Sequence, residues 1–431
     1  MNILSFTAGA GGMYCGSCGR DNALAAELMR QGHDVTLMPV YTPTRTDETN
    51  VSQPRVLFGG ISVYLQQRFA LFRRGPRALD RLWDAPSVIS VFAGRSVSTD
   101  PRLLGDLTIA MLEGQRGVLR REFEKLIDWV REQRRPDVIS LPNSLLISLA
   151  EPLRRAVGRP VCVTLQGEEL FVNGLVPPYR ERAVALIREQ VAHVDRFVAV
   201  SEYCARFMAE FLRIPSSRID VVPLGIALDG YERRLPPGGP FTIGYFARID
   251  PAKGLRVLAE AYVRFRERVG QAPTRLEAAG YLSPADRGYL DDVRQVLARA
   301  GLANQFTYRG EVDRAGKLAY LRSLDVLSVP ATYDEPKGLF LLEAMASGVP
   351  VVQPRRGAFV EIVERTGGGV LVEPDSPERL AEAFHALWQD REQAARLGRQ
   401  GFEGMRAHYS ITQSAERLVE VFGRAADQAS A

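Results

Sequence analysis

Cysteine and histidine are both scarce in this 431-residue sequence, which contains four of each. Four cysteines are too few for the disulfide framework of a chain of this size. The histidines are far apart in sequence, so a zinc site would need ligands gathered from distant parts of the chain. These absences weigh against a disulfide-stabilised protein and against a zinc protein. The residues are Cys15, Cys18, Cys162, Cys204, His33, His193, His385 and His408.

Long apolar runs and an excess of charge are also missing. No apolar run reaches 18 residues, so we expect no transmembrane helix. The first residues, "MNILSF", contain no basic region and continue into a strand-like run, which predicts a cytoplasmic protein without a signal peptide. The net charge of +4, from 55 basic and 51 acidic residues, does not call for a nucleic-acid partner. The 55 lysine and arginine residues are nevertheless enough to supply a binding site for a small anionic molecule.

Short apolar runs alternate with amphipathic stretches along most of the chain. This alternation predicts an α/β fold of parallel sheets covered by helices, in two Rossmann-like doubly wound domains that face a central cleft. The expected strands are 2–8, 34–41, 136–142, 160–166, 196–201, 241–248, 274–280, 305–309, 325–330, 350–354 and 369–373. The expected helices are 19–31, 145–157, 179–193, 202–213, 254–268, 286–300, 314–323, 338–347 and 377–389.

A segment rich in proline, glycine and charge, "DGYERRLPPGGPF", divides the chain and indicates a linker. The expected divisions are an N-terminal domain, 1–225, with an inserted segment at about 60–135; a linker, 226–240; a C-terminal domain, 241–410; and a C-terminal helix, 411–431. Within the insert, the segment 65–84 is basic, and its apolar residues recur in part at the spacing of a helix. Two interpretations stay open for 65–84: a helical excursion packed on its own domain, or an acceptor-binding or membrane-surface face.

A glycine-rich loop follows the first expected strand, in "TAGAGGMYCGSCGRD". A strand, a glycine loop and a helix present backbone N–H groups to a phosphate, although a tight turn without a ligand is the alternative. The spacing departs from G-x-G-x-x-G because Tyr14 stands at the third glycine position. With no second C-x-x-C and no histidine nearby, Cys15 and Cys18 do not indicate a four-ligand zinc site. A redox pair at the helix start is possible, but we expect reduced cysteines that pack the loop.

Two further segments place charged residues where parallel strands end. In "GYFARIDPAKGL", Arg248 and Lys253 follow a strand and precede a helix, a position suited to phosphate binding. In "ATYDEPKGLFLLEAMASGVPVV", Glu335 and Glu343 flank the expected start of a helix, where the amides of Gly338, Leu339 and Phe340 are unpaired. Carboxylates accept hydrogen bonds from sugar hydroxyls, while amides and cations hold a diphosphate. The plain alternatives are solvated cations and a glutamate that stabilises the helix dipole.

The glutamate segment resembles the E-x7-E signature of retaining glycosyltransferases with the GT-B fold, in particular glycosyltransferase family 4 and the related glycogen and starch synthases. "IGYFARIDPAKGLRVLAEAY" resembles the G-R-x-x-x-x-K-G element of that family, and the glycine loop resembles its opening loop. The resemblance covers nearly the whole chain. It implies that a sugar moves from a nucleoside-diphosphate sugar to an acceptor hydroxyl of a metabolite, glycan or lipid.

The resemblance also implies roles for individual residues. Arg248 and Lys253 would bind the donor diphosphate and stabilise its departure, Glu335 would contact the donor sugar, and Glu343 the ribose. Gly11, Gly12 and the amides of Gly338, Leu339 and Phe340 would complete the donor site, and these residues with Arg248, Lys253, Glu335 and Glu343 are the predicted catalytic and donor-binding set. Gln166 and Asn143 would lie on the acceptor or sugar side, with Gln166 standing where the family has histidine in T-x-H-G. Lys337 stands where an apolar residue is common.

No D-x-D triplet occurs in the sequence, which agrees with a reaction in which cations replace a metal, and we expect no metal and no other cofactor. Three other hypotheses stay open: a sugar-nucleotide epimerase of the same fold, a non-catalytic nucleotide-sugar-binding protein, and a thiol–disulfide protein. The donor base, the sugar and the acceptor are not readable from the sequence. A basic 65–84 segment leaves peripheral contact with the inner membrane face open.

Overall fold

The computed structural model describes residues 1–9, 16–58, 104–233 and 238–430. The chain forms two compact units, of which the first contains Met1–Pro223 and Ser414–Ala431 and the second Leu224–Gln413. The predicted glycine positions Gly11 and Gly12, Cys15, and the basic segment 65–84 lie outside the described residues.

The first unit is built on a parallel sheet in the order β2-β1-β3-β4-β5-β6. Its strands are apolar at most positions, as expected for a sheet that helices cover on both faces. The strands are β1 (Asn2–Thr7), β2 (Asp34–Pro39), β3 (Val138–Leu141), β4 (Val161–Leu165), β5 (Arg196–Ala199) and β6 (Ile219–Val221). The helices are α1 (Gly16–Arg30), α5 (Gly105–Glu113), α6 (Arg120–Glu132), α7 (Ala150–Val157), α8 (Glu169–Asn173), α9 (Tyr179–Gln190), α10 (Glu202–Leu212) and α18 (Ile411–Ser430).

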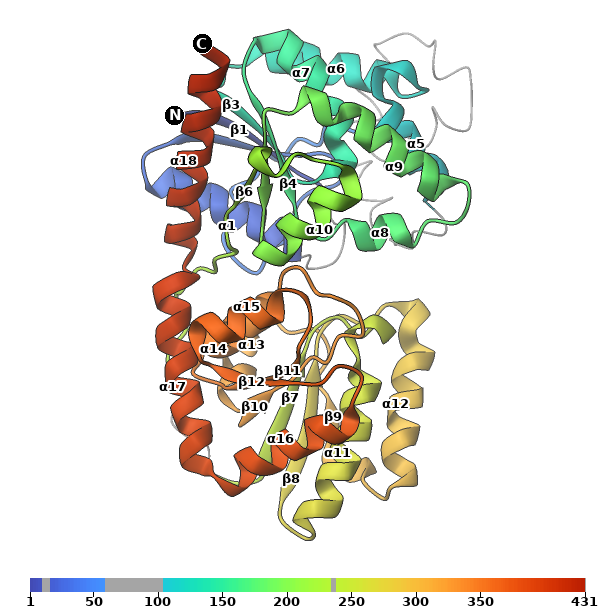
Figure 1. Cartoon of the computed structure of the whole chain (residues 1–431), viewed down its shortest axis with the longest axis vertical. Helices are drawn as coiled ribbons and strands as arrows, with labels where there is room; N and C mark the ends of the chain where they lie inside the picture. The colour runs from blue at the N-terminus through green and yellow to red at the C-terminus, as the bar shows by residue number, and fades with distance from the viewer. Residues whose placement is uncertain (10–15, 59–103, 234–237, 431) are drawn as a thin grey trace. The chain divides into compact units, whose positions relative to one another are not determined.

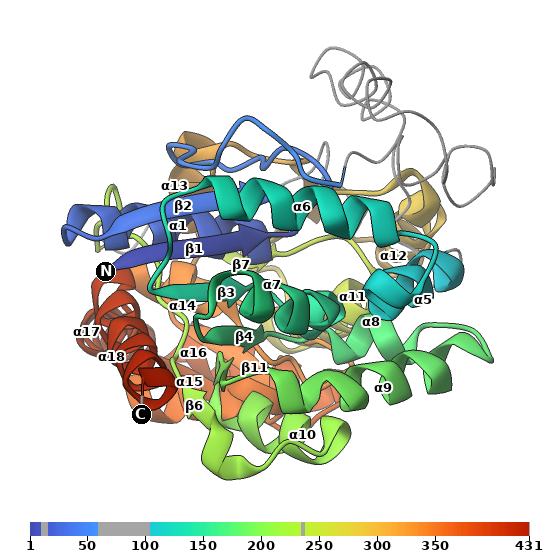
Figure 2. The same cartoon turned by 90° about the horizontal axis from the view of Figure 1, so that it is seen from above.

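Some details of this unit differ from the sequence expectation, which did not include α5, α6, α8 or β6. The helix predicted over 145–157 begins as a 3-10 turn, Ser144–Leu149, and becomes α7 only at Ala150. The side chain of Asn143 accepts a hydrogen bond from Leu145 N, two residues ahead, which favours the tighter start. Helix α6 packs beside α7 (Figure 2) and buries Phe123 against Phe58, with ring centroids 5.3 Å apart.

The second unit repeats the layout with a parallel sheet in the order β12-β11-β10-β7-β8-β9 (Figure 1). Its strands are β7 (Phe241–Phe246), β8 (Thr274–Ala279), β9 (Phe306–Tyr308), β10 (Val326–Leu327), β11 (Val351–Pro354) and β12 (Gly369–Val372). Its helices are α11 (Leu255–Val269), α12 (Arg287–Arg299), α13 (Arg314–Arg322), α14 (Leu339–Ala346), α15 (Gly357–Thr366), α16 (Pro377–Gln389) and α17 (Arg391–His408). Helices α15 and α17 are additions to the elements expected from the sequence.

The two parallel sheets with their helices confirm the predicted α/β class of two Rossmann-like doubly wound units. Large aromatic side chains fill the cores, with Phe6, Phe123 and Phe197 in the first unit and Tyr262, Phe265 and Phe384 in the second, all less than 2% exposed.

Helix α18 returns the end of the chain to the first unit, where Leu418 and Phe422 line a small cavity of about 20 Å³ together with Leu24 and Leu28 of α1. Phe422 is 1% exposed, so α18 contributes to the core of a unit formed mainly by residues two hundred positions or more earlier.

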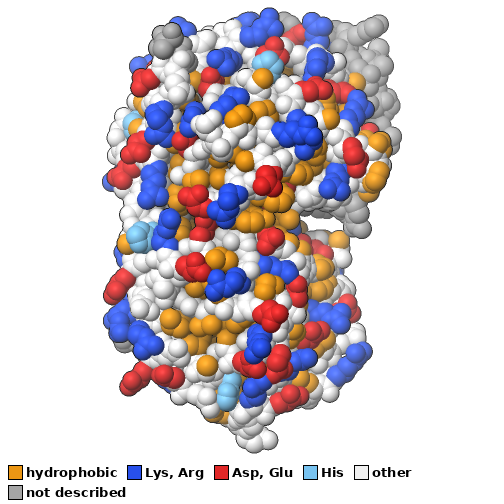
Figure 3. Space-filling view, viewed as in Figure 1, with side chains coloured by type: hydrophobic (Ala, Val, Ile, Leu, Met, Phe, Trp, Pro, Cys, Tyr) orange, Lys and Arg blue, Asp and Glu red, His pale blue; other side chains and the backbone are white. Residues whose placement is uncertain are grey.

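The described helices include none that is both long enough and apolar enough to cross a membrane. On the face drawn in Figure 3, lysine and arginine side chains are interspersed with aspartate and glutamate. This mixture agrees with the near balance of 55 basic and 51 acidic residues.

Candidate functional site

The second sheet changes direction of winding between β7 and β10, which are neighbours in space but not in sequence. In open parallel sheets, ligands bind where the carboxyl ends of two such strands meet. Arg248 and Lys253 follow β7, and Glu335 follows β10. The structure therefore brings these predicted residues to a common edge of one sheet.

Lys253 and Glu335 form an ion pair at this edge, and the hydroxyl of Tyr333 contacts both side chains. The Lys253 ammonium donates to Tyr333 and to Oε2 of Glu335, and Tyr333 donates to the same carboxylate oxygen. The Lys253 ammonium also lies 5.1 Å from the centre of the Tyr333 ring and 5.5 Å from that of Phe340. Of the three N–H bonds of the ammonium, the third stays available for a ligand.

Glu335 is held as a carboxylate although it is 2% exposed. Burial by itself raises the pKa of the carboxyl group, but the charge and hydrogen bond of Lys253, the hydrogen bond of Tyr333 and the charge of Lys337 outweigh it. The resulting pKa of Glu335 is about 2. A permanently ionised Glu335 is a hydrogen-bond acceptor, which suits contact with hydroxyl groups.

Arg248 is placed by the loop that follows β7. Its guanidinium contacts Oδ2 of Asp250 at 2.7 Å, and Oδ1 of Asp250 accepts from Ala252 N at 2.8 Å, which fixes the turn. The Arg248 side chain is 45% exposed, so its remaining donors reach solvent. Gly254 closes the loop with φ +76°, and a Cβ there would overlap the carbonyl oxygen of Pro330. Only glycine fits this close approach between the loops after β7 and β10.

Glu343 lies in the second turn of α14, where Oε1 accepts from Lys317 Nζ at 2.8 Å and from Tyr231 Oη at 3.3 Å. Lys317 comes from α13 and Tyr231 from the segment before β7. The two glutamates of the E-x7-E segment thus share one pattern, in which one lysine and one tyrosine contact a single carboxylate oxygen.

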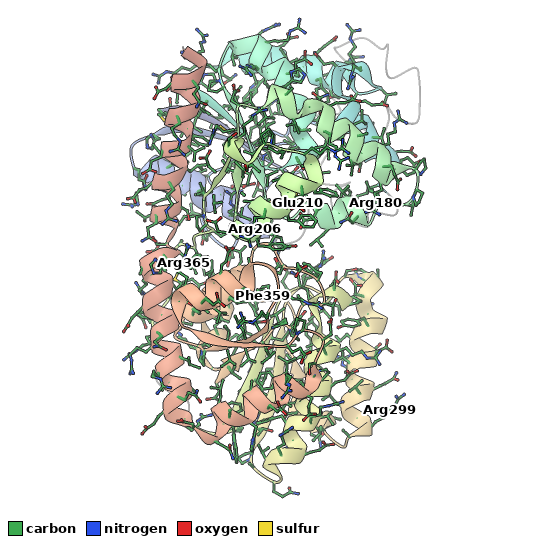
Figure 4. All side chains as sticks on the ribbon, viewed as in Figure 1. Arg180, Arg206, Glu210, Arg299, Phe359 and Arg365 are labelled. Atoms are coloured by element: carbon green, nitrogen blue, oxygen red, sulfur yellow. The ribbon has the colours of Figure 1, made fainter. Side chains whose placement is uncertain are left out.

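The amino terminus of α14 has the form expected of an anion site. Gly338 precedes the helix with φ +68°, and no side chain caps the first turn. The predicted residues Leu339 and Phe340 form that turn, whose N–H groups have no partner within the helix. Phe340 is 8% exposed and packs edge-on against Phe359 of α15, with ring centroids 5.7 Å apart, which anchors the turn. Figure 4 labels Phe359 on its helix.

In the first unit, the predicted residues Asn143 and Gln166 follow the neighbouring strands β3 and β4. Gln166 is 3% exposed, and its Nε2 donates to Pro142 O at 2.6 Å. Glu168 joins the same two loops, because its carboxylate accepts from Ser144 N at 3.0 Å and Gln166 N at 2.8 Å. In this conformation Gln166 holds two loops together, and a ligand would reach its amide only after movement of the neighbouring loops.

Sequence reasoning missed four residues of these networks: Tyr333, Lys317, Tyr231 and Glu168. Lys317 and Tyr231 reach Glu343 only through folding, Tyr231 from 112 positions away. Tyr333 and Glu168 lie two positions from Glu335 and Gln166, and this closeness in sequence was the available signal for them. Within the described part of the chain, no group of three or more histidine, cysteine, aspartate or glutamate residues could hold a metal ion.

Two family models match the chain. Residues 22–225 match the glycosyl transferase 4-like domain, and residues 232–404 match the glycosyl transferases group 1 domain. The chain belongs to the glycosyltransferases. Among solved structures, that of Anabaena HepE in complex with UDP and glucose superposes with a TM-score of 0.67 at 17% identity, covering 98% of this chain and 100% of that chain. Sucrose-phosphate synthase from Thermosynechococcus elongatus gives 0.71 at 18% identity, covering 98% of each chain.

These likenesses show that this glycosyltransferase has the GT-B fold. Among curated relatives, D-inositol 3-phosphate glycosyltransferase of Nocardia farcinica is 29% identical over 248 residues, which are 55% of this chain and 54% of the relative. A GDP-mannose-dependent phosphatidylinositol monomannoside mannosyltransferase of Mycobacterium tuberculosis is 29% identical over 64% of this chain and 72% of the relative. The chain thus spans about half the length of the first relative.

Proposed function

We propose that this glycosyltransferase transfers a sugar from a nucleoside-diphosphate sugar to an acceptor hydroxyl, with retention at the anomeric carbon and without a metal ion. The observation that carries the proposal is the meeting of Arg248, Lys253 and Glu335 at the switch point of the second sheet, beside the amino terminus of α14. Cations and helix amides favour a diphosphate, and an ionised glutamate favours a sugar.

The same residues account for how the nucleoside diphosphate leaves the sugar. As the bond between the anomeric carbon and the phosphate oxygen breaks, negative charge grows on the leaving diphosphate. Arg248, the third N–H of Lys253 and the α14 amides stabilise that charge, at roughly 1.5–3 kcal/mol for each charged hydrogen bond. A leaving phosphate oxygen takes the proton of the attacking hydroxyl, so the scheme requires no separate protein base.

The substrates of the relatives indicate where to search for the acceptor. Their names include D-inositol 3-phosphate and a phosphatidylinositol monomannoside, both of which are polyhydroxylated and phosphate-bearing. Their donors include GDP-mannose, whereas the HepE structure contains UDP. We therefore extend the proposal to acceptors with cyclitol or sugar hydroxyls, free or lipid-linked. The basic segment 65–84, for which a packed helical excursion and an acceptor-binding or membrane-surface face both stay open, lies outside the described residues.

A binding screen followed by a product assay tests the proposed function. Nucleoside diphosphates and nucleotide sugars are screened by thermal shift, because a ligand of the folded state raises its apparent stability. The best donor is then incubated with inositol and sugar acceptors, with and without EDTA, and the anomer of the product is read by NMR. A retained anomer formed in EDTA supports the proposal. Conversion of the donor sugar without an acceptor would indicate the epimerase instead, and binding without turnover a non-catalytic protein.

Glu335→Gln is the informative variant, because it keeps the shape of the side chain and removes its charge. We expect turnover to fall at least 100-fold, since the carboxylate that orients the sugar is lost, while nucleoside diphosphate binding changes little. Glu364→Gln is the matched control, since Glu364 is 58% exposed and forms an exposed pair with Arg355. Loss of diphosphate binding in Glu335→Gln with an unchanged rate would contradict the assigned roles.

A further inference from the structure

Oε1 of Glu343 is saturated by two protein donors. Lys317 Nζ lies 2.8 Å away and Tyr231 Oη 3.3 Å away. A carboxylate oxygen has two lone-pair positions, so both positions on Oε1 are used. A ligand hydroxyl therefore finds an acceptor only at Oε2.

The lysine of this arrangement is buried with its partner. The Lys317 side chain is 9% exposed and that of Glu343 16%. A buried ammonium is stable only when it is paired, so the contact with Lys317 keeps Oε1 of Glu343 turned toward α13. Removal of Lys317 would free Glu343 to rotate, so Oε2 would no longer be held in one direction before a ligand binds.

Tyr231 is itself held by two helices of the second unit. Its carbonyl oxygen accepts from Arg406 of α17 at 3.0 Å, and the guanidinium of Arg314 on α13 lies 5.3 Å from the centre of its ring. The side chain is 3% exposed. Its hydroxyl is thus fixed in place before any ligand binds, which lowers the entropic cost of orienting Glu343.

We propose that Lys317 and Tyr231 are positioning residues for nucleoside recognition, which occupy Oε1 of Glu343 and direct Oε2 alone to the ribose hydroxyls of the donor. The inference rests on the proposed function, in which Glu343 faces the ribose. It adds that the preference for a ribose over a deoxyribose depends on residues that do not touch the nucleotide.

The test compares two ligands in a set of variants. Isothermal titration calorimetry measures the affinities of UDP and GDP, and of their 2′,3′-dideoxy forms, for the full chain and for Lys317→Met, Lys317→Arg and Tyr231→Phe. Arg322→Met is the matched control, because Arg322 lies on the same helix and its contact with Glu232 at 3.6 Å is exposed. Hydrogen exchange confirms that each variant is folded.

We expect the wild-type chain to bind the better ribonucleotide about tenfold or more tightly than its dideoxy form. Lys317→Met should lose about tenfold in ribonucleotide affinity and leave the dideoxy affinity within about twofold, so the preference disappears. Tyr231→Phe should show a smaller loss of the same kind. Lys317→Arg should retain the preference, and Arg322→Met should resemble the wild type.

If Lys317 and Tyr231 have only a structural role, their substitution should lower the affinities for the ribo and dideoxy ligands equally, and that result overturns the inference. The inference also fails if Lys317→Met and Tyr231→Phe keep the wild-type preference, or if the wild-type chain binds ribo and dideoxy forms alike. Absence of any nucleoside diphosphate binding by the wild-type chain would instead overturn the proposed function, and this inference with it.

Discussion

Lys253 and Glu335 form an ion pair across the loops after β7 and β10, with side chains 17% and 3% exposed. The pair joins two loops 82 positions apart in sequence. Because a buried charge without a partner is costly, loss of either member of the pair alone should destabilise the second unit.

Lys253→Met should therefore weaken folding and turnover together. Loss of one partner of a buried pair costs about 3–5 kcal/mol, since the other charge stays buried. Hydrogen exchange of the β7 and β10 amides measures this cost within the second unit. The double variant Lys253→Met/Glu335→Gln should recover a large part of it, because no unpaired charge remains. A loss of less than about 1 kcal/mol in Lys253→Met, as for an exposed pair, would contradict this interpretation.

Glu335 should also make stability depend on pH in acid. Its pKa is lowered from 4.5 to about 2 in the folded protein, so between these values the unfolded chain binds more protons. The stabilisation is complete above about pH 5 and is lost as pH falls toward 2, by roughly 3 kcal/mol in total. Urea denaturation at a series of pH values should show this loss in the wild-type chain. The same series on Glu335→Gln should lack that component, and parallel curves for the two proteins would argue against the assignment.

Gly254 gives a test of the loop geometry that places Lys253. Gly254→Ala combines a left-handed backbone with overlap of its Cβ and Pro330 O, whereas Gly367→Ala, at φ +66° and ψ +14°, meets only ordinary contacts with Gln400 at 3.6 Å or more. The free energy of unfolding of the control should fall only by the cost of the left-handed backbone, about 1–2 kcal/mol. The free energy of unfolding of Gly254→Ala should fall further, and this variant should also bind the donor less tightly. Denaturation midpoints and thermal shift with nucleoside diphosphate measure both effects. Equal losses in the two variants would show that the loops separate easily.

The α/β class could be predicted from the sequence because buried parallel strands and amphipathic helices have distinct patterns along the chain. The positions of Arg248, Lys253 and Glu335 after strands, and of Glu343 near the start of a helix, followed from the same pattern. The contacts of Lys317 and Tyr231 with Glu343 could not be predicted, since these residues reach Glu343 only through the packing of α13 and of the segment before β7. Residues that are distant in sequence and follow no motif become neighbours through tertiary structure alone.

The return of α18 to the first unit was equally hidden from sequence, and Phe422 tests it. Phe422→Ala removes a side chain that is 1% exposed and should cost about 3–5 kcal/mol. The loss should appear in the first unit, because Phe422 lines a cavity with residues of β1 and α1. Hydrogen exchange should therefore speed up in β1 and β3 and stay unchanged in β7 and β8. Met29→Ala on α1, where Met29 is 36% exposed, should change neither set. Faster exchange in β7 and β8 alone would show that α18 supports the second unit, and the assignment of Ser414–Ala431 to the first unit would be wrong.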